Sequence, residues 1–203
     1  MLEQLIPFLT ASILLTLSPG PDIIYVLVQS MSNGKKAGIV TTLGLVSGII
    51  IHTSLVAFGV SAIIKASPVL FTLIKIFGAL YLFYLAYQVF RSDSSIAIVG
   101  DVPVRRSRNL YRQGFIMNVL NPKVTIFFLA FFPGFLWEPE GNTIFQFYLL
   151  GFLFMMQALI IFGTVAVLAG KISEYLMQHR RSGVFLKWTQ VVVFIGIGIL
   201  ILI

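Results

Sequence analysis

Long apolar runs alternate with short polar stretches along the whole chain. A run of about 20 apolar residues lets one helix cross the hydrocarbon core of a membrane, which is about 30 Å thick. The polar stretches between the runs are too short for a separate soluble domain. The pattern predicts six spans, at about residues 4–32, 38–64, 68–90, 114–136, 144–170 and 184–203.

The composition supports a membrane domain. Of the 203 residues, 58% are hydrophobic and 10% are charged, whereas a soluble domain has about 25% charged residues. The first residues carry Glu3 and no positive charge, so we expect no cleaved signal peptide. We predict an all-α integral membrane protein with a single transmembrane domain over residues 1–203.

The formal net charge is +7, and the basic residues gather in the loops on one side of the predicted spans. These residues are Lys35, Lys36, Arg91, Arg105, Arg106, Arg108, Arg112, Lys171, Arg180, Arg181 and Lys187. Only Lys65 lies in the loops of the other side. Basic loops face the cytoplasm, so we predict that both termini lie outside. Basic residues in such loops set the orientation of a chain in the membrane, so we expect no nucleic-acid partner. We expect these residues to contact membrane lipids.

Helix-breaking residues interrupt two of the predicted spans. The first span is broken at Ser18, Pro19, Gly20, Pro21 and Asp22, and the fourth at Asn121, Pro122 and Lys123. A proline inside a helix costs about 3 kcal/mol or more, and an ionisable group near the bilayer centre costs about 2.5–3.5 kcal/mol. The freed peptide groups cannot face lipid. The broken segments are therefore expected to line a cavity or to pack against protein.

The basic segment at 91–113 divides the six spans into three and three. Because each half has an odd number of spans, two similar halves would lie upside down relative to each other in the membrane. The first span of each half is interrupted. We predict a 3+3 inverted repeat with discontinuous helices 1 and 4. Its repeats are at about residues 4–90 and 114–203, joined by a cytoplasmic linker at 91–113.

Asp22 and Lys123 are expected at similar depths in the membrane. At 1.5 Å per residue, both lie within a turn or two of one level. The alternative for Asp22 is that Pro21 and Asp22 begin the inner half-helix, where the dipole favours a carboxylate. The alternative for Lys123 is that its long stem carries the ammonium toward water. We favour a binding site that uses both charges.

Further polar side chains share helical faces with these residues. Tyr25 and Gln29 follow Asp22 along one stripe, and Asn118 shares a face with Asn121. Such stripes fit either the wall of a water-filled path or hydrogen bonds between helices. Asn121 either offers its amide to a substrate carboxylate or caps the backbone freed by the following proline.

Three more side chains are weaker candidates for the wall of a cavity. They are Tyr81 and Tyr84 on the third span and Gln157 near the middle of the fifth. Lys75 on the third span lies nearer the outer surface, where its ammonium can extend toward water.

The second span carries Gly44, Gly48 and His52 at intervals of four residues, and Gly59 one heptad after His52. Glycines so spaced let another helix approach closely. An imidazole titrates near neutral pH. His52 is therefore either a packing residue with satisfied hydrogen bonds or a group that passes a proton.

Several function classes are disfavoured. The chain contains no cysteine, which excludes thiolate metal sites and iron–sulfur clusters, and no second ligand stands at metal-binding spacing from His52. We expect no metal and no cofactor. An intramembrane hydrolase would need a nucleophile with a base, and Ser18 with His52 is the only candidate pair. We expect no enzyme; the alternative to a transporter is a passive channel or a structural membrane subunit.

The motifs resemble those of a known family. The similar parts are SPGPD, SNGKKAG, the glycines of GLVSG, His52, Gly59, LIKIFGALYL and GFIMNVLNPKVTIFFLAFFPGF. In these parts the chain resembles the LysE/RhtB-type amino-acid exporters. The resemblance covers about residues 5–137 with motifs and the remainder by span pattern. It implies a secondary transporter in the bacterial inner membrane. Such a transporter exports amino acids or related small metabolites from the cytoplasm, driven by the proton gradient.

An amino acid carries a carboxylate and an ammonium close together, so its binding site needs one group that binds an anion and one that binds a cation. The expected substrate-binding set is Ser18, Pro19, Gly20, Pro21, Asp22, Asn118, Asn121, Pro122 and Lys123, with Asp22 and His52 as proton-coupling groups. Because Asp22 is the only acidic residue well inside the spans, we favour neutral over basic amino acids. From Val191 onward the sixth span has no polar side chain, so it faces lipid or a second subunit of a homo-oligomer.

Overall fold

The computed structural model describes residues 2–93, 106–139, 141–179 and 182–202, and all the regular structure in them is helical. The first half contains α1 (Leu2–Leu17), α2 (Pro21–Asn33), α3 (Lys35–Ser54), the π-helical η1 (Leu55–Val60), α4 (Ser61–Ala66) and α5 (Pro68–Arg91). The second half contains α6 (Ser107–Val119), α7 (Pro122–Ile126), the π-helical η2 (Phe127–Phe131), the 3-10 helix η3 (Phe132–Phe135), α8 (Thr143–Gln178) and α9 (Ser182–Leu202).

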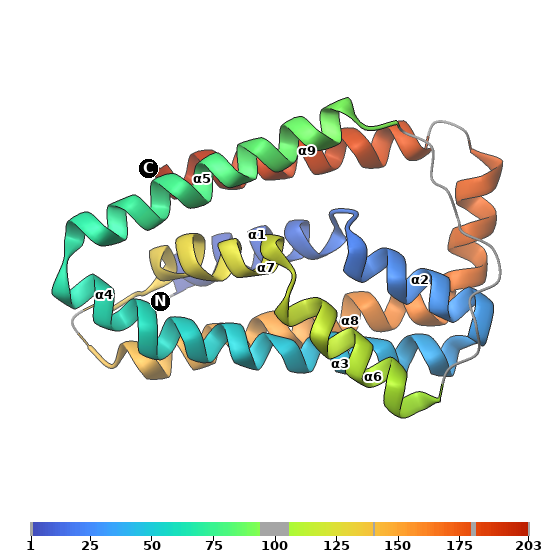
Figure 1. Cartoon of the computed structure of the whole chain (residues 1–203), viewed down its shortest axis with the longest axis horizontal. Helices are drawn as coiled ribbons and strands as arrows, with labels where there is room; N and C mark the ends of the chain where they lie inside the picture. Colours follow the sequence, from blue (N-terminus) through green and yellow to red (C-terminus); the bar gives the residue numbers. More distant parts are fainter. Residues whose placement is uncertain (1, 94–105, 140, 180–181, 203) are drawn as a thin grey trace.

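Four helical segments of the described chain are long and apolar enough to cross a membrane. They are Lys35–Ile63, Pro68–Arg91, Thr143–Leu176 and Ser182–Leu202. Two bent pairs pass the same test, α1 with α2 at 54° and Ser107–Val119 with Pro122–Phe135 at 47°. If each pair is one span, the described chain has up to six, at the positions that the apolar runs predict. The fifth is longer than expected, and the last turns of α8 bend across one end of the bundle (Figure 1).

The two bends have the same local cause. After the first break α2 begins with Pro21 at its first position, and after the second α7 begins with Pro122. Proline is suited to this position because its fixed φ fits the helix and its missing N–H would be unpaired there. Each interrupted segment is therefore two helices, as the sequence predicts for helices 1 and 4. The inverted symmetry of the two halves stays a prediction.

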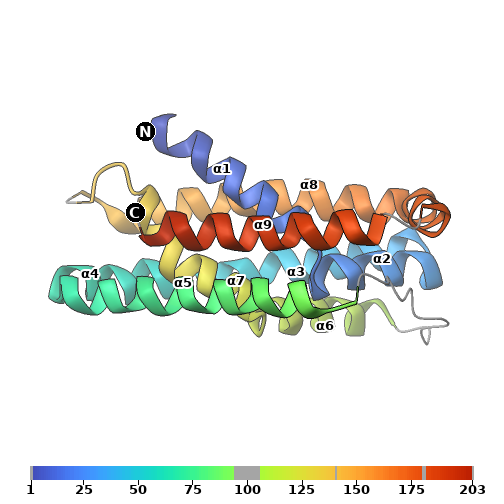
Figure 2. The same cartoon turned by 90° about the horizontal axis from the view of Figure 1, so that it is seen from above.

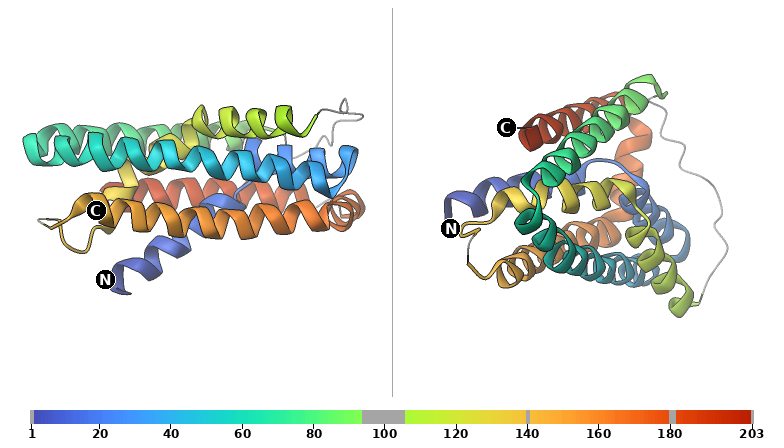
Figure 3. Two further views of the ribbon diagram at one scale, coloured as in Figure 1. Left: turned by 90° about the horizontal axis from the view of Figure 1, so that it is seen from below. Right: turned by 60° about the vertical axis from the view of Figure 1, so that its left-hand side comes forward.

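The helices lie in three tiers (Figures 1 and 3). α5 and α9 pack against each other in one tier, α1 and α7 lie in the middle, and α3, α8, α2 and α6 form the remaining tier. Figure 2 shows that the first turns of α1 diverge from the other helices. The ends of the chain that the structure describes lie at one end of the bundle, and the described helix ends with most of the basic residues lie at the other (Figure 1). Which end faces the cytoplasm stays a prediction.

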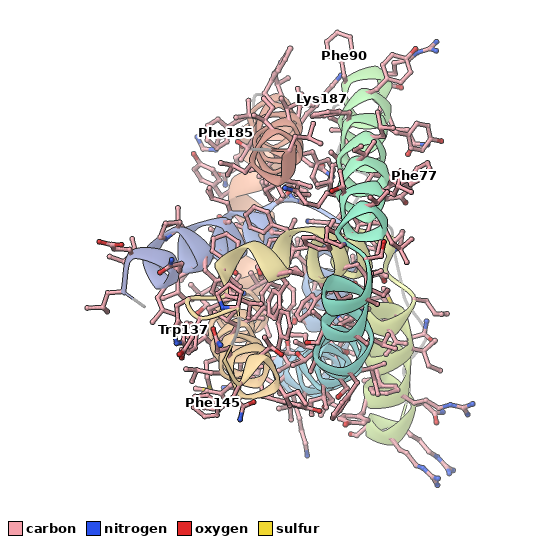
Figure 4. All side chains as sticks on the ribbon, turned by 90° about the vertical axis from the view of Figure 1, so that its left-hand side faces the viewer. Phe77, Phe90, Trp137, Phe145, Phe185 and Lys187 are labelled. Atoms are coloured by element: carbon pink, nitrogen blue, oxygen red, sulfur yellow. The ribbon has the colours of Figure 1, made fainter. Side chains whose placement is uncertain are left out.

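The outer surface of the bundle is apolar. Phe77 on α5 and Phe185 on α9 point away from their neighbours (Figure 4) and are 68% and 72% exposed. A soluble protein rarely exposes so many large apolar side chains. This surface fits contact with lipid.

An aromatic cluster fills the bundle between the middle tier and α8. Phe8, Phe127, Phe128, Phe132 and Phe147 are fully buried. The rings of Phe128 and Phe132 stack with centroids 4.2 Å apart, and Phe8 meets Phe132 edge to face at 5.2 Å. Because aromatic contacts of this kind stabilise packing beyond the area they bury, the cluster helps to hold these helices together.

Glycines allow α3 and α6 to cross closely. A Cβ atom on Gly44 would collide with the carbonyl oxygen of Tyr111, and one on Gly48 would lie 2.6 Å from Oδ1 of Asn118. On the facing helix, a Cβ on Gly114 would lie 2.5 Å from the carbonyl oxygen of Thr41. The packing interpretation of the glycine stripe is confirmed at these positions. Gly59 differs, because no described atom lies within 4 Å of the Cβ it lacks, so none of the described helices approaches it closely.

Candidate functional site at the two helix breaks

The two breaks meet inside the bundle, where a side chain of one binds the backbone of the other. Nζ of Lys123 donates a hydrogen bond of 2.9 Å to the carbonyl oxygen of Ser18. That carbonyl lies in the unwound segment between α1 and α2, where no helix supplies a donor. Lys123 is 9% exposed, and its Nζ also lies 5.5 Å from the centroid of the Phe194 ring. A buried ammonium therefore replaces the hydrogen bond that the break removed.

The ammonium also lies beside the start of α2. A Cβ atom on Gly20, the residue that precedes this helix, would lie 3.6 Å from Nζ of Lys123. No side chain caps the first N–H groups of α2. A helix N-terminus carries positive partial charge and free N–H donors, which favour an anion. Two anion-attracting groups therefore converge at Gly20.

Asp22 lies in the first turn of α2 and is 7% exposed. Its Oδ2 accepts a hydrogen bond of 3.4 Å from Nδ2 of Asn118 on α6. The carbonyl oxygen of Asn118 lies 3.1 Å from Nε2 of His52, which must carry the proton in this bond because a carbonyl can only accept. Asn118 thus joins Asp22 to His52. Among the residues that the structure describes, Asp22 and Lys123 hydrogen-bond to these other groups and not to each other.

Three buried oxygen atoms of this site have no hydrogen-bond partner within the described part of the chain. They are Oδ1 of Asp22, Oδ1 of Asn118 and the hydroxyl of Ser18. Buried polar atoms are nearly always paired, because leaving one unpaired costs about 1–3 kcal/mol. Three such atoms together indicate a place for a donor from outside the chain.

A small cavity of about 30 Å³ joins these groups. Its lining includes Ser18, Gly20, Asp22, Asn118, Asn121 and Lys123. A volume of this size holds about one or two water molecules, so a larger ligand requires the site to open. The apolar walls come from Leu15, Ile49, Phe154 and Phe162 among others; these side chains carry no chemical signal that sets them apart in the sequence.

Asn121 caps the second half-helix of its span. Its Oδ1 accepts a hydrogen bond of 3.0 Å from the backbone N–H of Lys123. The capping interpretation is therefore correct for its oxygen. The side chain also lines the central cavity, so a contact with a ligand stays a prediction.

The weaker candidates lie at different places. Gln157 on α8 donates to Oγ1 of Thr16, a residue that lines the cavity and that the sequence analysis did not single out. Gln29 is fully buried and accepts from Asn33, and Tyr25 is half-buried on α2; neither lines the central cavity.

Tyr84 is 53% exposed and accepts from Gln88, and the half-buried Tyr81 is its ring neighbour at 6.1 Å. Neither tyrosine lines the central cavity. Both lie on α5, which packs mainly against α9 and so keeps this face away from the two breaks.

The structure does not assemble a hydrolase dyad. The hydroxyl of Ser18 has no partner in the described chain, and Nε2 of His52 is bonded to a carbonyl. Among the described residues, no group of three or more histidine, aspartate or glutamate side chains could hold a metal ion.

A protein-family comparison decides the relationship that the motifs suggest. The model of the LysE type translocator matches residues 13–203. The chain belongs to the LysE-type translocator family. Both helix breaks of this translocator, and every residue that lines its central cavity, lie inside the matched region.

Individual relatives extend the comparison. The translocator is 27% identical over 207 residues to an uncharacterised membrane protein of Bacillus subtilis, and the match covers 98% of each of the two chains. It is 28% identical over 174 residues to a homoserine/homoserine lactone efflux protein of Salmonella typhimurium, covering 86% of this chain and 84% of the relative. It is 31% identical over 147 residues to a leucine efflux protein of Salmonella choleraesuis, and the match covers 70% of this chain and 68% of the relative. No solved structure matches the chain.

Proposed function

We propose that this translocator exports neutral amino acids from the cytoplasm in exchange for protons, and that it binds them between the two helix breaks. The observation that carries the proposal is the pairing of opposite chemistries in one cavity. Unpaired acceptors at Asp22 and Asn118 line the same cavity as an ammonium beside a helix N-terminus. Efflux relatives named for homoserine and leucine support an amino-acid substrate.

The carboxylate of the substrate binds at Gly20. The first N–H groups of α2 have no side-chain cap, and Lys123 brings a full positive charge next to them. An ammonium has three donors, and only one is used by the carbonyl of Ser18. Lys123 can therefore keep its bond to the unwound segment and still bind an anion.

The ammonium of the substrate binds at Asp22. It donates to Oδ1 of Asp22 and Oδ1 of Asn118, the two acceptors that lack donors. Charge-assisted hydrogen bonds of this kind are roughly twice as strong as neutral ones. The backbone carbonyl of Asn118 binds His52, and its side-chain amide nitrogen donates to Asp22.

Transport requires access from the two membrane sides in turn. In this structure the central cavity is too small for an amino acid, and larger cavities of about 330 and 340 Å³ lie toward opposite ends of the α5–α9 pair. Corresponding helices of the two halves pack together, α5 with α9 and α3 with α8. This pattern favours an inverted repeat whose halves rock around the site. Proton entry from outside neutralises Asp22 and releases the ammonium, with His52 connected to Asp22 through Asn118.

The end of the bundle that holds the basic connections is assigned to the cytoplasm by the positive-inside rule. Release at the other end then corresponds to export through the inner membrane of a bacterial cell. The unpartnered apolar face of α9, where Val192 is 65% exposed, contacts lipid or a second copy of the chain.

Counterflow of labelled amino acids in proteoliposomes tests the proposal. The panel contains leucine, threonine, homoserine and lysine, and it compares the unmodified chain with Asp22→Asn. We expect saturable exchange of a neutral amino acid that Asp22→Asn reduces strongly. Lys171→Met is the matched control, because Lys171 lies within the apolar helical segment Thr143–Leu176 and lines none of the three cavities. Flux without saturation would support a channel, and no flux of any amino acid in folded protein would overturn the proposal.

A further inference from the structure

A second cavity lies at the cytoplasmic end of the predicted export path. It has a volume of about 330 Å³ and is lined by residues of α2, α5, α8 and α9 and by Leu17 and Pro19 at the first break. Its interior is apolar, formed by Leu27 on α2, Ile172 and Leu176 on α8 and Leu186 on α9, among others. Unlike the central cavity, it has room for a whole amino acid.

Polar groups border this cavity on the side formed by the end of α5 and the start of α9. Asp93 supplies a carboxylate, and Lys187 supplies an ammonium. Nζ of Lys187 donates to the carbonyl oxygen of Ser92 at 2.7 Å and lies 5.8 Å from the Phe90 ring centroid. Figure 4 shows Lys187 and Phe90 at the same end of the α5–α9 pair. Because an ammonium has three donors, Lys187 keeps donors for a carboxylate ligand.

The unwound segment of the first span separates the two cavities. Ser18 and Gly20 line the central cavity, whereas Leu17 and Pro19 line the cytoplasmic one. The lining residues of the two cavities alternate along this segment, so it contributes to the wall of each. Ile23, the residue after Asp22, lines both. Ile23 and the backbone of residues 17–20 are thus shared between the walls of the two cavities.

We propose that this cytoplasmic cavity is an entry site for neutral amino acids with apolar side chains, and that Ile23 with residues 17–20 forms the gate to the central site. The proposal rests on the proposed export function and adds the class of side chain. Asp93 and Lys187 bind the two charged groups of the amino acid, and the apolar interior accepts its side chain. A lysine side chain is rejected because its second ammonium would enter the apolar interior without a partner.

Cysteine protection tests the entry site directly, because the chain has no cysteine of its own. Leu176→Cys places a thiol in the cavity, and Tyr175→Cys places one on the next residue, which is 59% exposed and does not line it. Leu186→Cys and Phe185→Cys form a second matched pair on α9, which serves if the first is poorly folded. The measured quantity is the rate of labelling by a water-soluble maleimide in inside-out membrane vesicles, with and without leucine.

We expect leucine at about ten times its Kd to slow labelling of Leu176→Cys about tenfold, because only the empty site reacts. Labelling of Tyr175→Cys stays unchanged, and lysine protects neither thiol. Protection by leucine persists when Asp22→Asn is added, because the entry site is distinct from the central one. Equal protection of both neighbours, protection by lysine, loss of protection with Asp22→Asn, or no protection at all would each overturn the proposal.

The same samples separate this proposal from the export function. Counterflow without protection would leave export standing and remove the entry site. Protection without counterflow would leave the entry site standing and remove the export function. Ile23→Trp adds a test of the gate: it is expected to stop counterflow while leucine still protects Leu176→Cys. Undiminished counterflow in Ile23→Trp would show that Ile23 does not separate the cavities.

Discussion

Lys123 binds the carbonyl oxygen of Ser18, 105 residues earlier in the chain, and so joins the two broken spans at one point. The bond has a structural role, because it satisfies a backbone carbonyl that the break leaves free. The same ammonium lies at the N-terminus of α2, where an anion would bind. The first prediction separates these two roles.

Lys123→Met is expected to abolish transport and to leave thermal unfolding in detergent little changed. Methionine keeps most of the length of the stem but has no donor for the Ser18 carbonyl, at a cost of about 1–3 kcal/mol. This loss is offset because a buried ammonium no longer has to be removed from water. Counterflow and an unfolding curve of the same preparation give both readouts. Transport at the unmodified rate would contradict a role in substrate binding.

Asp22→Asn is expected to fold and to lose the effect of the proton gradient. Asparagine has the size of aspartate and retains an oxygen that can accept from Asn118. In the unmodified chain, lowering the outside pH relative to the inside accelerates export, because protonation of Asp22 from outside releases the substrate. In Asp22→Asn the residual flux is independent of that gradient. The check is flux measured at several outside pH values with the inside pH fixed; a retained dependence would place the coupling proton elsewhere.

His52→Gln distinguishes a packing residue from a proton carrier. In the buried site, Nε2 of His52 lies 3.1 Å from the backbone carbonyl oxygen of Asn118. Glutamine keeps a donor for that oxygen, but it cannot titrate. We expect transport and its dependence on the pH gradient to persist, because Asp22 carries the proton. If the same flux measurement shows normal exchange but no response to the gradient, His52 is the coupling group.

Gly114→Ala is expected to destabilise the protein by about 1–3 kcal/mol, the usual range for overpacking. Its new Cβ would lie 2.5 Å from the backbone oxygen of Thr41, which can move only if α3 and α6 separate. Gly163→Ala on α8 is the matched control, since nothing lies within 4 Å of its Cβ. There alanine should be neutral or stabilising by about 1 kcal/mol. Denaturant unfolding of both variants gives the comparison, and equal stability would contradict the close crossing.

Asn121→Ser tests whether Asn121 does more than cap α7. Serine is as good a cap as asparagine, whereas alanine loses about 1 kcal/mol. If capping is the whole role, Asn121→Ser transports normally and only Asn121→Ala is weakened. We expect Asn121→Ser to retain stability but to raise the KM for export, because the shorter side chain no longer reaches a ligand in the cavity. An unchanged KM in Asn121→Ser would assign Asn121 to capping alone.

The positions of the spans and their breaks follow from the sequence because both are local effects. Apolar runs of sufficient length form helices in a membrane whatever their neighbours are. Proline is favoured at the first position of a helix, and Pro21 and Pro122 mark where α2 and α7 begin. The glycines at 44 and 48 could likewise be assigned to close packing, although Gly59, one heptad after His52, has no described atom within 4 Å of the Cβ it lacks.

The site itself depends on contacts between distant segments. The sequence placed Asp22 and Lys123 at similar depths, but their actual partners are Asn118 and the carbonyl of Ser18, which only the packing of α6 and α7 against the first break could select. Thr16, Phe154 and Ile23 line cavities without any distinguishing local pattern. Tyr84 was placed near a cavity by its helical face, but the pairing of α5 with α9 leaves it exposed.

The sequence by itself therefore determined that the chain is helical, where its spans and breaks lie, and which charges stand at the breaks, since helix length, proline geometry and the cost of buried charge act within one segment. Tertiary structure alone decided which atoms of the site meet, which acceptors stay unpaired, and how thin the partition at Ile23 is. These features arise from the relative placement of helices, which depends on many weak contacts distributed over the whole chain.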